Sequence, residues 1–126
     1  MDLTPLVPSG KHVAQRYGNG RFVIAGIAYP HSILLSPYEV LPWAIQSLEQ
    51  VTLEGIKPIL GSQQNATLEL LLLGCGKSFS PPPRGLRQEL EALGTALEPM
   101  DTGAACRTFN VLASEDRRVA AALICI

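Results

Sequence analysis

The chain is poor in charge, and the little charge that it carries is spread out. Only 17% of its 126 residues are charged, and the net charge is −1. The ten Lys and Arg residues are scattered along the sequence. Nucleic-acid binding needs clustered basic residues that neutralise phosphates, so we predict no nucleic-acid partner. With 47% hydrophobic residues, the composition is instead typical of a compact globular protein.

Long hydrophobic runs are also missing. The longest, Val119 to Ile126, is much shorter than the roughly 18 apolar residues that a membrane-spanning helix needs. The N-terminus has no basic region before an apolar stretch, and it lacks the Arg-rich, acid-poor character of a mitochondrial presequence. We therefore predict no membrane span and a soluble bacterial protein of the cytoplasm.

Cysteine and histidine are scarce, and their spacing is not that of a metal site. Cys75, Cys106 and Cys125 form no CxxC pair, and an odd number of thiols suits a reducing compartment. The two histidines, His12 and His31, have no carboxylate at a suggestive spacing and lack the close spacing of zinc ligands. The sequence therefore predicts no metal and no cofactor, and it offers few groups for catalysis.

Turn residues and apolar periodicity predict alternating strands and helices. Residues 1–10 hold prolines and a glycine without periodicity and are expected to form an N-terminal arm, which leaves one domain over 11–126. The first two strands form a hairpin around the turn Gly18-Asn19-Gly20. The predicted strands are 12–17, 21–28, 32–35, 68–73, 95–99 and 119–126. Three helices are predicted: a short one that begins near Thr52, and two that span 84–93 and 102–112.

The order of these elements predicts the fold class. In the C-terminal half, strand, helix, strand, helix and strand follow one another, which predicts two right-handed crossovers and a parallel core sheet. The run 68–73 is almost wholly aliphatic, as in a strand covered on both faces. With the hairpin adding antiparallel strands, the expected fold is a single α/β domain with an N-terminal β-hairpin, a mixed and partly parallel sheet, and flanking helices.

The helix predicted over 102–112 has two different faces. At about 100° per residue, one stripe should pack on the sheet, and it holds Ala105, Phe109 and Leu112. The opposite face holds Gly103, Arg107 and Asn110. Two interpretations remain open: a solvated surface, or a polar cleft to which Arg107 offers its planar fork of donors and Asn110 an amide. Asp101 or Thr102 is the expected N-cap.

A second candidate is the glycine turn Gly74-Cys75-Gly76-Lys77-Ser78, which follows the predicted buried strand. A Walker phosphate loop would need glycine at Leu71, and a dinucleotide-binding fingerprint would need glycine at Phe79, so neither motif is present. Two interpretations survive: a plain turn at the strand exit, or a turn whose backbone N–H groups and Lys77 hold a small anion.

Both features are expected at the carboxyl edge of the sheet, where open α/β sheets bind ligands. A helix N-terminus and a lysine there would suit an anionic or carbonyl-bearing ligand. Near the same N-terminus, Cys106 is a candidate nucleophile or redox-sensing thiol, at the margin of the core stripe. The candidate ligand-binding residues are Gly74, Gly76, Lys77, Asp101, Thr102, Arg107 and Asn110.

Two other segments allow either a structural or a partner-binding role. Tyr38 and Trp43 flank Pro42, and they form either a local core plug or an exposed anchor for a protein partner. The run Glu115-Asp116-Arg117-Arg118 is either a charged turn before the last strand or a partner contact.

Several segments carry a family resemblance. They are Tyr17-Gly18-Asn19-Gly20-Arg21-Phe22, Leu72-Leu73-Gly74-Cys75-Gly76-Lys77, Met100-Asp101-Thr102, 104–112 and 117–123, together with Trp43. They resemble the Mth-type domain family, which includes the mitochondrial assembly factor three of respiratory complex I and many bacterial and archaeal proteins of unassigned function. The resemblance covers about residues 11–126 and implies the same α/β fold.

The resemblance also implies a function, since the mitochondrial members look like protein-binding assembly factors rather than enzymes. The leading hypothesis is therefore a non-enzymatic assembly factor with an unidentified protein partner. The alternative is a small-molecule-binding protein or enzyme that uses the cleft at the carboxyl edge. The sequence leaves open whether the chain forms a homo-oligomer.

Overall fold

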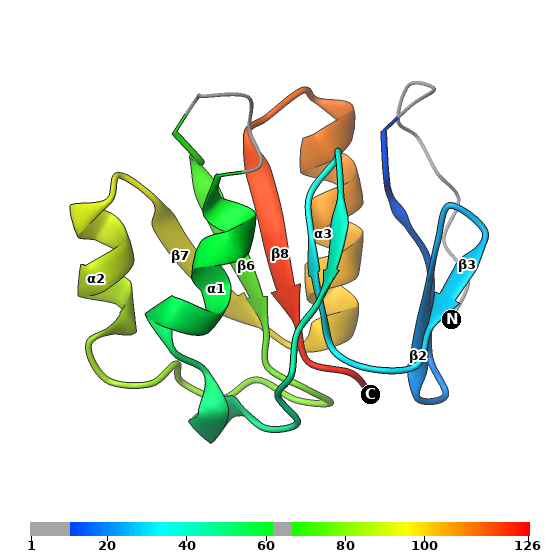
Figure 1. The fold of residues 1–126 in the computed structure, drawn as a ribbon, viewed down its shortest axis with the longest axis horizontal. Helices are drawn as coiled ribbons and strands as arrows, with labels where there is room; N and C mark the ends of the chain where they lie inside the picture. The colour runs from blue at the N-terminus through cyan, green and yellow to red at the C-terminus, as the bar shows by residue number, and fades with distance from the viewer. Residues whose placement is uncertain (1–10, 62–66) are drawn as a thin grey trace.

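The computed structural model describes residues 11–61 and 67–126, so the predicted arm over 1–10 lies outside the described residues. The described chain forms two β-sheets and three α-helices (Figure 1). Its strands are β1 (Ala14–Gly18), β2 (Arg21–Ile24), β3 (Ile27–Tyr29), β4 (Ile33–Leu35), β5 (Val40–Pro42), β6 (Leu70–Gly74), β7 (Ala96–Met100) and β8 (Val119–Leu123). Its helices are the 3-10 helix η1 (Leu48–Gln50), α1 (Leu53–Leu60), α2 (Leu86–Ala92) and α3 (Thr102–Ser114).

The larger sheet has five strands in the order β5-β4-β8-β6-β7. Strand β6 pairs in parallel with β7 and β8, whereas β4 pairs antiparallel with β8 and β5. The predicted mixed, partly parallel α/β fold is confirmed. The aliphatic strand β6 lies inside the sheet, between β8 and β7, and Leu71, Leu72 and Leu73 are fully buried. They are buried because α1 and α2 cover one face of this sheet and α3 covers the other.

The first three strands form a separate antiparallel sheet, β1-β2-β3, instead of joining the larger one. The antiparallel strands of the larger sheet are β4 and β5. The prediction of one strand over 21–28 is wrong because Ala25 and Gly26 adopt left-handed φ angles of 51° and 79°. These values match the two-residue turn at Asn19 and Gly20, with φ angles of 55° and 74°. Such turns follow the twist of the strands that they join.

Helix α3 lies between the two sheets, as Figure 1 shows. Its buried side chains, among them Ala105 and Phe109, belong to the same core cluster as Phe22 of β2 and Leu123 of β8. A second cluster lies on the other face of the larger sheet, under α1 and α2. The three-stranded sheet thus adds a further layer beyond α3. Sequence periodicity contains no signal for this layer.

Helix boundaries agree with the predictions to within a few residues. Burial differs from expectation at Leu93 and Tyr38. In α2, Leu86 and Leu90 are buried as predicted, but Leu93 follows the helix end and is 49% exposed. Trp43 is buried in the core under α1, which confirms the core plug, whereas Tyr38 is exposed. Within the described residues, no helix combines the length and apolar character needed to cross a membrane.

Candidate functional site

The carboxyl ends of β6 and β7 meet at a topological switch point. The chain leaves β6 toward α2 on one face of the sheet and leaves β7 toward α3 on the other, an arrangement that usually opens a crevice for ligands. Here the protein's own backbone closes that crevice. The Cys75 amide donates to the Met100 carbonyl at 2.8 Å, and the Thr102 amide donates to the Gly76 carbonyl at 2.8 Å.

Thr102 ties three elements together at this point. Its buried hydroxyl donates to the Ile124 carbonyl at 2.7 Å and accepts from the Gly76 amide at 3.0 Å. Gly74 permits the close approach, because a Cβ there would lie 3.0 Å from the Thr102 Oγ1 atom. The Gly76 N–H group that was expected to hold an anion is therefore already bonded. These residues join β6, β8 and α3, which is a structural role.

Asp101 is the N-cap of α3, and its carboxylate accepts from the Ala104 amide at 2.8 Å. Lys77 is exposed in the loop that follows β6. Four cavities of 330 to 570 Å³ lie on the described surface, and none of these four is lined by Lys77, Asp101 or Arg107. The predicted site residues thus do not line a common cavity among these.

The predicted open polar face of α3 is covered by β1. The Asn110 carboxamide accepts from the Ala14 amide at 2.9 Å and donates to the Ala14 carbonyl at 2.9 Å, and Asn110 is only 8% exposed. The Arg107 guanidinium donates to the Tyr17 hydroxyl at 2.5 Å. A Cβ on Gly103 would lie 2.9 Å from the Tyr17 ring. β1 therefore takes both hydrogen-bonding groups of Asn110, which the hypothesis of a ligand cleft had assigned to a ligand.

Cys106, the candidate reactive thiol, lies in the core. The side chain is fully buried between the helix and its neighbours. Burial raises the pKa of the Cys106 thiol to about 12, and the nearby positive charge of Arg107 only partly opposes this. A thiolate is the nucleophilic and oxidisable form of cysteine, so burial disfavours the reactivity predicted for this thiol.

The charged run after α3 behaves as a turn whose arginines bind within the chain. Arg117 forms an ion pair with Glu69, with an Nε–Oε1 distance of 2.9 Å, and lowers the pKa of that carboxyl through this hydrogen bond. Arg118 donates from Nε to the Thr67 carbonyl at 2.7 Å. The structure therefore favours the interpretation of a charged turn over that of a partner contact.

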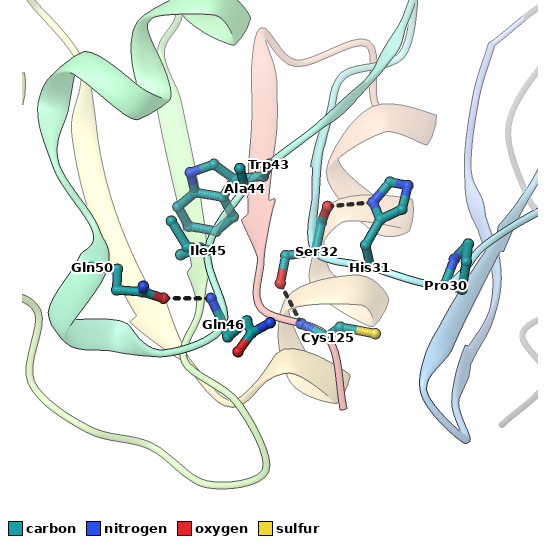
Figure 2. A pocket seen from close by; sticks show the side chains of 9 residues that line it. All are labelled: Pro30, His31, Ser32, Trp43, Ala44, Ile45, Gln46, Gln50 and Cys125. Carbon is teal, nitrogen blue, oxygen red and sulfur yellow. Dashed lines mark hydrogen bonds between the residues drawn. The ribbon is translucent and has the colours of Figure 1, made fainter.

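A cavity that the sequence did not predict lies beyond the carboxyl end of β8 (Figure 2). We call it the Trp43 cavity; its volume is about 570 Å³. Its walls come from the link between β3 and β4, from the segment after β5 and from the chain end. They comprise residues 30–32, 43–46, Gln50 and Cys125. These segments are far apart in the sequence and share no motif, so no local signal points to them.

Hydrogen bonds fix the walls of this cavity. The Ser32 hydroxyl accepts from the Cys125 amide at 2.9 Å, which holds the chain after β8 against the start of β4. The Gln50 side-chain oxygen accepts from the Gln46 amide at 2.6 Å and from the Ser47 amide at 3.2 Å. Figure 2 shows the bonds from Ser32 to Cys125 and from Gln50 to Gln46. In the described part of the chain, no group of three or more metal-ligating side chains converges.

Two features define the class of this small mixed α/β domain: its two sheets enclose α3, and backbone hydrogen bonds close its switch point. Residues 14–124 match the sequence profile of the family described as "Protein of unknown function (DUF498/DUF598)". The chain belongs to this family.

Relatives in this family are bacterial and eukaryotic. An uncharacterized protein of Rhodobacter capsulatus is 40% identical over 108 residues, which cover 86% of this chain and 80% of that protein. NADH dehydrogenase (ubiquinone) 1 alpha subcomplex assembly factor 3 of Xenopus tropicalis is 31% identical over 110 residues. The match covers 87% of this chain but only 59% of the frog protein.

Solved structures share the fold. A crystal structure of a Bordetella parapertussis protein superposes with a TM-score of 0.84 at 30% identity, covering 94% of this chain and all of that one. A solution structure from Bordetella pertussis, described as a Mth938-like domain, gives a TM-score of 0.79 at 26% identity and covers 98% of this chain and 91% of that one. The Mth-type resemblance inferred from the sequence is confirmed.

Proposed function

We propose that this protein is a non-enzymatic, protein-binding assembly factor that acts in the bacterial cytoplasm on a respiratory or membrane-protein complex. The observation that carries the proposal is the similarity to complex I assembly factor 3, which extends over 87% of this chain. Because the chain spans about three fifths of that relative, the shared part is the folded domain described above.

The roles of the polar residues support this proposal. Thr102 and Asn110, which resembled site residues in the sequence, bond to backbone groups within the chain. Cys106 is buried with a raised pKa. The same motifs that identify the family thus stabilise the arrangement of its layers. A domain of this kind acts through the surfaces that its layers expose.

The test is deletion of the gene in its bacterial host. We expect membranes of the deletion strain to lose most NADH:quinone oxidoreductase activity, and native gels to show subcomplexes in place of the full complex. Succinate:quinone oxidoreductase activity in the same membranes is the control. Full activity and a full-size complex in the deletion strain would refute the role in complex I assembly.

A further inference from the structure

We propose that the Trp43 cavity is the docking site for an uncharged segment of the partner protein. The inference rests on the proposed protein-binding function and names the chemistry of the partner at one site. The cavity is the largest of the four compared above, and its volume of about 570 Å³ lies within the range of about 300–1,000 Å³ that ligand sites occupy. It also lies at the carboxyl edge of the sheet, where α/β domains bind ligands.

The charge of the cavity walls selects the partner. Among the described residues that line the cavity, none is Lys, Arg, Asp or Glu, and the titratable side chains are His31 and Cys125. A phosphate or carboxylate placed here would meet no Lys or Arg side chain, and an ammonium group would meet no Asp or Glu, among the residues that line the cavity, so neither charge gains a strong partner for the hydration that it loses. The cavity therefore favours a ligand without net charge, unlike the anion site that the sequence suggested around Lys77.

The polar groups of the walls match a peptide backbone. The Gln50 oxygen is already bonded to backbone amides, so its NH₂ group is the part left to donate. The Ser32 oxygen accepts from the Cys125 amide, which leaves the Ser32 hydroxyl hydrogen to donate. Gln46 adds both a donor and an acceptor. Amide and hydroxyl groups of this kind pair with the N–H and C=O groups of an incoming chain.

The shape of the cavity also suits a protein segment. Its floor is buried, with Ser32 at 3% and Trp43 at 4% exposure, and its rim is formed by the exposed residues Pro30, Ala44 and Gln46. An extended segment can cross the rim and lie over this floor, with Trp43 packed in the core beneath it.

The experiment uses an array of capped 12-residue peptides. It spans the host's complex I subunits and includes a general set of uncharged sequences with acidic and basic counterparts. Hits are titrated in solution against the full chain. Trp43 is the only tryptophan in the sequence, so its fluorescence reports binding at this cavity. Bound peptide should also slow alkylation of Cys125 by iodoacetamide, because that thiol lines the cavity.

Two matched variants localise the binding. Ala44→Arg places a long cation at the exposed rim, and Ala92→Arg makes the same change at the exposed end of α2, far from the cavity in sequence and outside its walls. We expect Ala44→Arg to weaken peptide binding more than tenfold and Ala92→Arg to change it less than twofold. Circular dichroism melting of both variants confirms that they remain folded.

Three results would overturn the inference: no peptide binds, the bound peptides are mainly acidic or basic, or Ala44→Arg leaves binding unchanged. If a small neutral molecule binds in the cavity but no peptide does, the inference is also overturned. The test is separable from that of the proposed function. If the protein binds peptides but its deletion leaves complex I intact, only the assembly role is refuted. If the protein is required for assembly, but no peptide binds and the Ala44→Arg variant still supports assembly, only the docking site is refuted.

Discussion

Asn110 of α3 and Ala14 of β1 are joined by two hydrogen bonds of 2.9 Å, although they are 96 positions apart in the sequence. The carboxamide donates to the Ala14 carbonyl and accepts from the Ala14 amide, as the peptide group of a neighbouring strand would. It thereby provides hydrogen-bond partners for the backbone N–H and C=O groups on the outer edge of β1 at Ala14. Together with the Arg107–Tyr17 bond, this pair links the three-stranded sheet to the helix.

Replacing Asn110 by Ala should destabilise the protein by about 2–4 kcal/mol, because both backbone groups of Ala14 would be left buried without partners. Urea unfolding followed by circular dichroism measures this change. Val111→Ala, at the 48% exposed neighbouring position, is the control and should change stability by less than about 0.5 kcal/mol. Equal stability of the two variants would show that the Asn110 bonds do not hold the sheet.

Gly103→Ala should cost about 1–2 kcal/mol. The new methyl group would lie 2.9 Å from the Tyr17 ring, and the overpacking outweighs the gain in helix propensity. The matched control is Gly61→Ala, because Gly61 has an ordinary φ of −92° and a Cβ there would meet no atom within 4 Å. Thermal melting compares the two variants. A melting temperature of Gly103→Ala at or above that of the wild type would contradict the close packing of β1 on α3.

Thr102→Val should destabilise the protein by about 2–3 kcal/mol, because the nearly isosteric valine cannot bond to Gly76 or Ile124. Thr102→Ser keeps the hydroxyl and should retain most of the stability, at a cost of about 1 kcal/mol for the lost methyl group. The free energy of unfolding in urea distinguishes the two. If serine proved as damaging as valine, packing of the methyl group rather than the hydroxyl would control this junction.

Stability should fall at alkaline pH through Cys106. Burial raises the pKa of its thiol from 9.0 to about 12, so the folded state keeps the thiol neutral while the unfolded chain ionises first. The resulting stabilisation is complete below pH 9 and is lost as the pH rises from 9 to about 12. Between pH 8 and pH 10.5, the wild type should lose on the order of 1–2 kcal/mol more stability than Cys106→Ala. Parallel stability curves for the two proteins would contradict this assignment.

Local patterns predicted four of the five strands of the larger sheet and missed the short edge strand β5. The aliphatic run of β6 was predicted to be covered on both faces, and it is, because helices lie on each side of it. The N-cap was predicted at Asp101 or Thr102 and is Asp101, and the short helix that begins after Thr52 was also predicted, because capping is a contact between near neighbours in the sequence.

The candidate site was predicted less well, for a physical reason. The helical periodicity around Arg107 shows that Asn110 shares its face, but it cannot show that β1 covers this face. Placing β1 there depends on bonds between residues about 90 positions apart, such as Arg107 to Tyr17. The same limit applies to the Trp43 cavity, whose walls combine residues 30–32 with Cys125.

The sequence by itself determined the fold class, most helix and strand positions and the family, because these follow from propensity, capping and apolar patterns read over short windows. Only the tertiary structure decided that Thr102, Cys106 and Asn110 stabilise the fold, since each role arises from burial or bonding by distant segments. It also decided where a cavity remains. The closed switch point and the open Trp43 cavity both depend on how the layers pack, and packing energy is a property of contacts between elements.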